Sequence, residues 1–104
     1  MHIQFNTDNH IEGKDRVSAY FSPLIAESLK RFEDKVTGLE IHLGDENSDK
    51  FGNDDKRCSM EARIAGHQPV AAVHHADTID KAINGATAKI KRILETTFDK
   101  MRTH

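Results

Sequence analysis

The chain of 104 residues has one cysteine, no tryptophan and only two prolines, and no apolar run in it approaches the roughly 18 residues that span a bilayer. A single cysteine excludes an internal disulfide, so we expect the reducing environment of the cytoplasm. The first residues lack the charged and then apolar segments of a secretion signal. These absences predict a protein that is not exported and has no membrane partner.

The charges that are present are unevenly distributed. The formal net charge is −2, with 37% apolar and 31% charged residues, which fits one folded domain over residues 1–104. Residues 1–55 contain 12 acidic and 6 basic side chains, whereas residues 56–104 contain 5 acidic and 9 basic ones. Because salt screens charges beyond about 8 Å, a cationic face is compatible with an acidic total.

Four segments alternate apolar and polar residues with the period of a strand that buries one face. Gly66-His67 predicts a tight hairpin turn between the last two of these segments. Pro69 cannot donate a hydrogen bond to a sheet ladder, so the last strand is expected at an edge. The inward residues are Ile3 and Phe5 in the first strand, Leu39, Ile41 and Leu43 in the second, and Cys58, Met60, Ala62 and Ile64 in the third, while the fourth strand runs from about Pro69 to His75.

Two segments have helical periodicity instead. The first runs from roughly Lys14 to Asp34, and we favour one helix kinked at Pro23 because the apolar stripe keeps its phase across the proline. The second runs from about Thr78 to Arg102, with Asp77 as the predicted N-cap and Asp80 completing a capping box.

The order β-α-β-β-β-α predicts an α+β fold in which a four-stranded mixed sheet carries both helices on one face. The first two strands are expected to be parallel, since a helix connects them. The other face of the sheet stays open, and its polar residues are His2, Gln4, Glu40, His42, Arg57, Glu61 and Arg63.

The acidic stretch 44–55 is rich in Gly, Asn and Asp and predicts an exposed loop. Its spacing of acidic residues resembles a calcium-binding loop. However, Lys50 and Lys56 stand where such a loop needs its glycine and its bidentate glutamate. The pattern therefore does not predict a calcium site.

The remaining reactive side chains give little support to an enzyme. His42 with Glu40 is the best candidate metal pair, but no cysteine pair or His-Glu-x-x-His spacing accompanies it. His74 and His75 are adjacent on a strand and point to opposite faces. Cys58 lies in the inward phase and is expected to be a core residue. We predict no catalysis, no metal, no cofactor and no small-molecule substrate.

Basic residues gather on the polar side of the last helix. Lys81, Lys89 and Arg92 fall within one helical stripe, so together they could meet one phosphate backbone. Gly85 on the same stripe leaves room for close approach. The pattern indicates a candidate nucleic-acid surface, and a merely solvated helix face is the alternative.

Several segments together carry a family likeness. They are the element order, Asn9-His10-Ile11-Glu12 before the first helix, the segment from Leu29 to Val36, and Ala82-Ile83-Asn84-Gly85 with Lys89, Arg92 and Leu94 behind it. Over essentially the whole chain, the sequence resembles the family of ribosome hibernation-promoting factors and ribosome-associated inhibitor A, also called the sigma-54 modulation family, in its short single-domain form.

The resemblance implies a layout like that of double-stranded-RNA-binding domains. It also implies a translation inhibitor that is not an enzyme and that binds the small ribosomal subunit through rRNA phosphates under stress. It carries rRNA contacts over to Lys30, Arg31, Lys81, Lys89 and Arg92, with Lys91 as an addition. With the cations of the third strand included, the expected RNA-binding set is Lys30, Arg31, Lys56, Arg57, Arg63, Lys81, Lys89, Lys91 and Arg92.

Two alternatives from different functional classes stay open. The weaker one is a metal-responsive domain centred on His42 and Glu40, and the other involves a protein partner. The chain could be a diverged protein-interaction or regulatory module that uses the acidic loop 44–55 and the open sheet face. Such a module would bind a basic protein partner.

Overall fold

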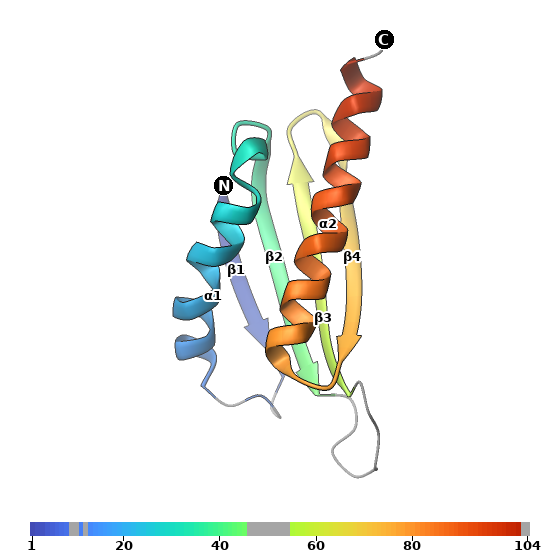
Figure 1. Ribbon diagram of the computed structural model, residues 1–104. Helices are drawn as coiled ribbons and strands as arrows, with labels where there is room; N and C mark the ends of the chain where they lie inside the picture. Colours follow the sequence, from blue (N-terminus) through green and yellow to red (C-terminus); the bar gives the residue numbers. More distant parts are fainter. Residues whose placement is uncertain (9–10, 12, 46–54, 103–104) are drawn as a thin grey trace.

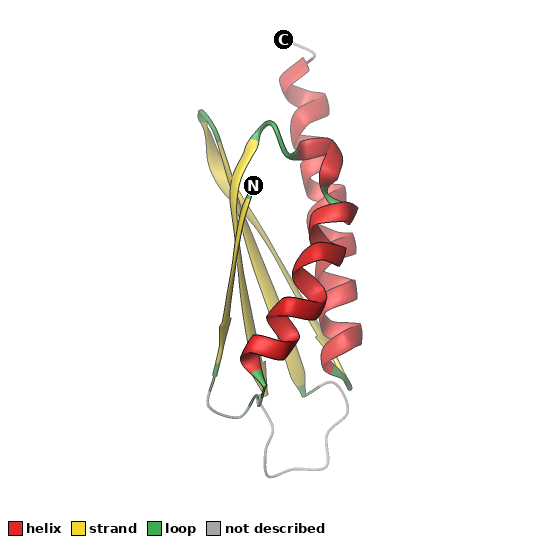
Figure 2. Cartoon of the chain, turned by 90° about the vertical axis from the view of Figure 1, so that its left-hand side faces the viewer, coloured by secondary structure: helices red, strands yellow, loops and turns green. Residues whose placement is uncertain are grey.

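The computed structural model describes residues 1–8, 11, 13–45 and 55–102. Its four strands form one sheet in the order β1-β2-β3-β4, with β1 and β2 parallel and the other pairs antiparallel. Both helices lie on the same side of the sheet, which confirms the predicted α+β fold (Figures 1 and 2). The elements are β1 (His2–Thr7), α1 (Lys14–Ser28), a 3₁₀ turn η1 (Lys30–Phe32), β2 (Val36–Asp45), β3 (Lys56–Ile64), β4 (His67–Ala76) and α2 (Ile79–Arg102).

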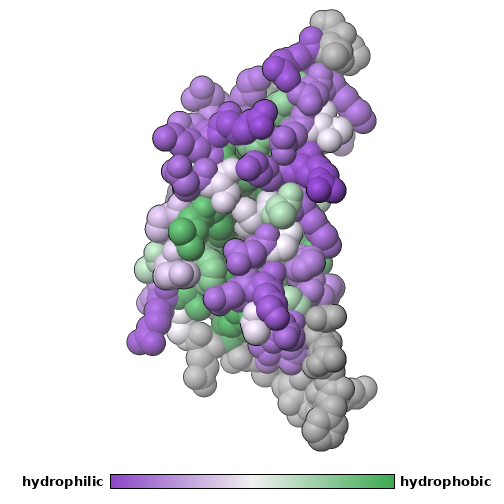
Figure 3. Space-filling view, in the orientation of Figure 1, coloured by the Kyte–Doolittle hydropathy of each residue, from purple (hydrophilic) through white to green (hydrophobic). Residues whose placement is uncertain are grey.

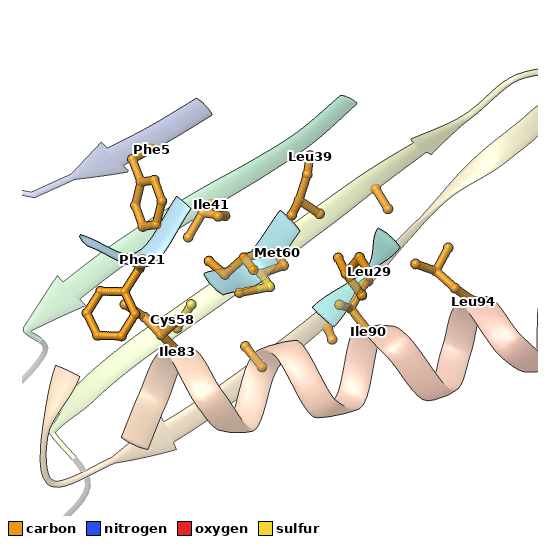
Figure 4. Packing of buried hydrophobic residues seen from close by; sticks show 14 of the residues in the cluster. Phe5, Phe21, Leu29, Leu39, Ile41, Cys58, Met60, Ile83, Ile90 and Leu94 are labelled. Atoms are coloured by element: carbon orange, nitrogen blue, oxygen red, sulfur yellow. The ribbon is translucent and has the colours of Figure 1, made fainter. Parts of the chain in front are cut away.

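The core lies between the sheet and the two helices, and it is made by the inward phase of every strand (Figure 4). Ile41 and Met60 in the sheet face Ile83, Ile90 and Leu94 of α2, and each of these side chains is at most 1% exposed. The predicted alternation is confirmed in β2 and β3. Burial of these apolar side chains is the main force that holds α2 on the sheet.

The helix α1 passes through Pro23 as one helix, as expected, but it ends at Ser28 rather than near Asp34. The chain then tightens into η1. Leu29 and Phe32 are both buried there, at 0% and 4% exposure. Residues three apart lie on the same side of a 3₁₀ turn, so this turn directs both side chains into the core.

The start of α2 differs from the sequence prediction. The Thr78 hydroxyl accepts a hydrogen bond from the backbone N–H of Lys81 (3.2 Å), so Thr78 is the N-cap. The Asp77 carboxylate instead forms an ion pair with the Lys81 ammonium at 3.2 Å. The prediction of Asp77 as the N-cap, with Asp80 completing a capping box, was therefore wrong by one residue. Threonine and aspartate both carry the acceptor oxygen that caps a helix, so the sequence pattern does not distinguish Thr78 from its neighbour Asp77.

The β3–β4 hairpin and the edge position of β4 were both predicted correctly. Gly66 adopts φ +72° in the turn, a conformation that costs little only for glycine. β4 is the last strand in the order of the sheet, and α2 crosses in front of β3 and β4 (Figure 1).

None of the described helices is both long and apolar enough to cross a membrane.

Candidate nucleic-acid interface

Lys81, Lys89 and Arg92 all lie exposed on α2. Lys81 and Arg92 are eleven residues apart in the helix, a distance of about 16 Å along its axis. Lys81 is paired with Asp77, as described above. Lys89 reaches the edge of the sheet, where its ammonium donates to the main-chain carbonyl of Val73 at 2.8 Å. Lys89 and Arg92 therefore lie on the side of α2 that faces β4, and together they line a groove there.

Lys91 lies about 100° around α2 from Arg92, toward η1. It precedes Glu95 by one helical turn, so the two residues share a face. The Glu95 carboxylate forms an ion pair with Arg31 at 3.4 Å, which places this face beside η1. Lys30 is exposed in the same turn. The sequence prediction missed Lys35, which lines a notch of about 120 Å³ together with Arg31.

We call Lys30, Arg31, Lys35 and Lys91 the η1 cluster. Aromatic rings hold two of its cations in place, since Arg31 lies 5.1 Å from the Phe32 ring and Lys35 lies 5.1 Å from another buried ring, that of Phe98. Lys35 could have been identified from the sequence, because it lies within the segment from Leu29 to Val36 that carries the family likeness.

Gly85 does not leave room for a ligand, contrary to the prediction. A Cβ atom at this position would stand 2.0 Å from Cδ2 and 2.4 Å from Cγ of His74. The imidazole of His74, on the inward phase of β4, already fills the space over the glycine. The absence of a side chain at Gly85 therefore allows α2 to approach β4 closely.

Arg57 and Arg63 point away from the helices. Both belong to the outward phase of β3, so they lie on the open face of the sheet. Arg63 forms an ion pair with Glu40 at 3.4 Å, and Glu40 also contacts His42 Nε2 at 3.4 Å. A flat partner that contacts α2 cannot contact these two arginines at the same time, because the sheet lies between them.

Lys56 lies at the base of the acidic stretch rather than on a free cationic surface. Its ammonium is 3.2 Å from the Asp55 carboxylate and 3.4 Å from that of Asp45, and its side chain is 24% exposed. The hydrogen bond to Asp55 raises the pKa of Lys56, with further contributions from Asp45 and opposed by burial. Its charge is shared with two carboxylates.

Residues 46–54 lie outside the described residues, so the predicted loop and the excluded calcium site are not tested.

Cys58 and the histidines are the side chains that the sequence offered for metal binding or nucleophilic chemistry. In the part of the chain that the structure describes, no group of three or more His, Cys, Asp or Glu residues could hold a metal ion. Cys58 is fully buried, as predicted, and burial raises the pKa of its thiol to about 12. A nucleophilic cysteine needs the opposite shift, because the thiolate is the reactive form.

The family model described as "Sigma 54 modulation protein / S30EA ribosomal protein" matches residues 3–102. The chain belongs to this family. The family resemblance drawn from the sequence is therefore confirmed.

Two solved structures share the fold of this S30EA-family chain. The N-terminal domain of Thermus thermophilus Protein Y is 17% identical, with a TM-score of 0.73 over 93% of this chain and 99% of that one. A ribosomal subunit interface protein from Coxiella burnetii is also 17% identical, with a TM-score of 0.68 over 95% of this chain and 99% of that one. No curated protein matches the chain. At 17% identity these structures show the shared fold alone.

Proposed function

We propose that this chain binds the small ribosomal subunit through rRNA phosphates and represses translation as a hibernation factor. Membership of the S30EA family supports an association with the ribosome. The structural relative from Coxiella burnetii is named for the interface between ribosomal subunits, which agrees with such a role.

The observation that carries the proposal is the charge on the helical layer. Lys89 and Arg92 share one side of α2, and neither pairs with a carboxylate of the described residues; the Lys89 ammonium meets only a neutral carbonyl. Hydrophilic residues cover much of α2 on the face shown in Figure 3. Exposed cations that lack an internal carboxylate partner can neutralise phosphates and release the counterions bound there.

The η1 cluster adds a second group of cations to the same helical layer, since both helices lie on one side of the sheet (Figure 2). Arg31 already shares its charge with Glu95, so Lys30 and Lys91 are the stronger contacts within this cluster. Recognition of this kind uses phosphate contacts and the shape of structured RNA rather than base edges.

The proposal assigns the RNA surface to the helical layer and leaves Arg57 and Arg63 outside it. Those two arginines provide a matched control because they lie on the opposite face. The double variant Lys89→Gln with Arg92→Gln and the double variant Arg57→Gln with Arg63→Gln remove the same amount of charge. We expect only the first to release the protein from small subunits when both are sedimented with purified subunits at rising KCl.

The salt dependence gives the quantitative test. Each phosphate contact that is lost should lower the slope of log affinity against log salt by roughly one. Binding by the Lys89 and Arg92 double variant with an unchanged affinity and slope would refute the assignment of the surface. Equal loss in both double variants would show that only the total charge matters.

The protein-interaction alternative gains no support from the described residues. Most of the acidic stretch lies outside them, and the open sheet face mixes Arg57 and Arg63 with Glu40 and Glu61. Capture of a basic protein by this stretch stays a prediction.

A further inference from the structure

The edge of the sheet at β4 presents main-chain groups beside α2. The carbonyl of Val73 faces this edge, because it accepts the hydrogen bond from Lys89 at 2.8 Å. In an antiparallel pair the N–H and C=O of one residue point to the same side, and this side alternates along the strand. Val73 pairs with Ser59 and Ala71 with Glu61, so the main-chain groups of both Val73 and Ala71 point away from β3.

A groove of about 330 Å³ lies between α2 and Ala72 of β4, next to this edge. Its lining is mostly apolar, with Ala72 from β4 and Ala88 and Ile93 from α2. The volume falls at the lower end of the range of ligand pockets, roughly 300 to 1,000 Å³. A strand added beside β4 would direct every second side chain to the helical side of the sheet, where this groove lies.

The charge of the groove is of one sign. Lys89 and Arg92 are the charged residues that line it, and no carboxylate stands among the described residues of its lining. Its occupant should therefore carry carboxylates next to apolar side chains. A bare phosphate would use the two cations but neither the apolar lining nor the outward main-chain groups of β4.

We propose that the β4 edge binds an extended peptide segment that adds a fifth strand to the sheet, and that the peptide side chains facing the groove are in turn apolar and acidic. The main chain of the peptide pairs with Ala71 and Val73, and its apolar side chains enter the groove. Main-chain pairing provides affinity and the groove provides specificity, as in other cases of strand addition.

Lys89 has two roles in this proposal. In the free protein its ammonium covers the Val73 carbonyl, which protects the edge strand from unwanted pairing with other chains. When the peptide binds, its N–H replaces the ammonium at that carbonyl, and the released ammonium meets a carboxylate of the peptide. Because Lys89 and Arg92 are also the proposed rRNA contacts, peptide and ribosome should compete for them.

The test uses a fluorescein-labelled peptide about eight residues long, which is within the usual length of a strand. Valine and glutamate take turns at every second position, so that both face the groove, and threonine fills the positions between them. Fluorescence anisotropy with the full chain should show saturable binding. We expect binding to weaken by roughly tenfold or more when lysine replaces glutamate in the peptide, or when alternate peptide nitrogens are methylated.

Two protein variants separate strand addition from simple charge attraction. Val73→Pro removes an N–H that faces the edge and leaves the ladder to β3 intact, so it should abolish binding. Ala88→Leu fills the groove at an exposed position of α2 and should weaken binding. Leucine is close to alanine in helix propensity, so this variant should fold and keeps the test valid if Val73→Pro does not.

Equal binding of the glutamate and lysine peptides would overturn the proposal. So would binding that depends on Lys89 and Arg92 but not on Ala88→Leu or on methylation of the peptide, because that result would describe an anion patch without strand addition. No ribosome is present in this assay, so its outcome is independent of whether the chain represses translation.

Discussion

Replacing Gly85 with alanine should destabilise this protein, although the same change in an exposed helix normally stabilises. Alanine is favoured over glycine in a helix interior by about 0.8 to 1 kcal/mol. At this position, however, the new methyl group would stand 2.0 to 2.4 Å from three atoms of the His74 ring. One of these atoms is Cγ, at the root of the ring, so a small rotation of the ring cannot relieve the clash.

Either His74 must change its rotamer or α2 must move away from β4. Overpacking of this kind costs about 1 to 3 kcal/mol, and the gain in helix propensity offsets about 1 kcal/mol of it, so Gly85→Ala should lower the free energy of unfolding by up to about 2 kcal/mol. The measurement is urea unfolding followed by the circular dichroism of the helices at equilibrium.

The control is the same substitution in a His74→Ala background. With the ring removed, Gly85→Ala should stabilise by up to about 1 kcal/mol, so its effect changes sign. The resulting coupling between the two sites should be on the order of 2 kcal/mol. A stabilising effect of Gly85→Ala in the wild-type background would refute the contact between the His74 ring and α2.

Three further predictions follow from single positions. Gly66→Ala should cost about 1 kcal/mol in urea unfolding because φ is +72°, and Gly66→Asn should cost less since asparagine tolerates this conformation. Cys58, with its pKa raised to about 12, should react with a thiol reagent at pH 8 only as fast as the protein unfolds; fast reaction of the native protein would contradict its burial. The ion pairs raise the pKa of Lys56 above its ordinary value of 10.5, so their stabilisation is present below that pH and lost above it. The difference in melting temperature between wild type and Lys56→Met should therefore shrink as the pH rises beyond 10.5, and a constant difference would contradict this.

The elements could be predicted from the sequence because each depends on spacing within one short segment. Cys58 and Met60 were assigned to the buried face of a strand, and both are buried. The same reasoning failed where distant contacts decide the outcome. The end of α1 at Ser28 depends on the need to bury Leu29 and Phe32 under α2, and the role of Gly85 depends on a ring from β4.

The candidate site was predicted only in part. The cations of α2 were identified from their helical stripe, but Arg57 and Arg63 were grouped with them although they lie across the sheet. Lys56 was placed in the expected RNA-binding set, and the structure shows that Asp45 and Asp55 share its charge. The positions of basic residues in the sequence do not specify on which side of the sheet each one lies. They also do not specify which carboxylates the fold brings next to each one.

The amino-acid sequence by itself determined the order of the elements, the face that each one buries and therefore the family fold, because period-two and helical patterns are local properties of the chain. Only the tertiary structure decided which cations share a surface, which are neutralised, and that the edge of β4 meets α2 in a groove. These properties depend on distances between residues far apart in the chain, and those distances exist only after the helices have packed on the sheet.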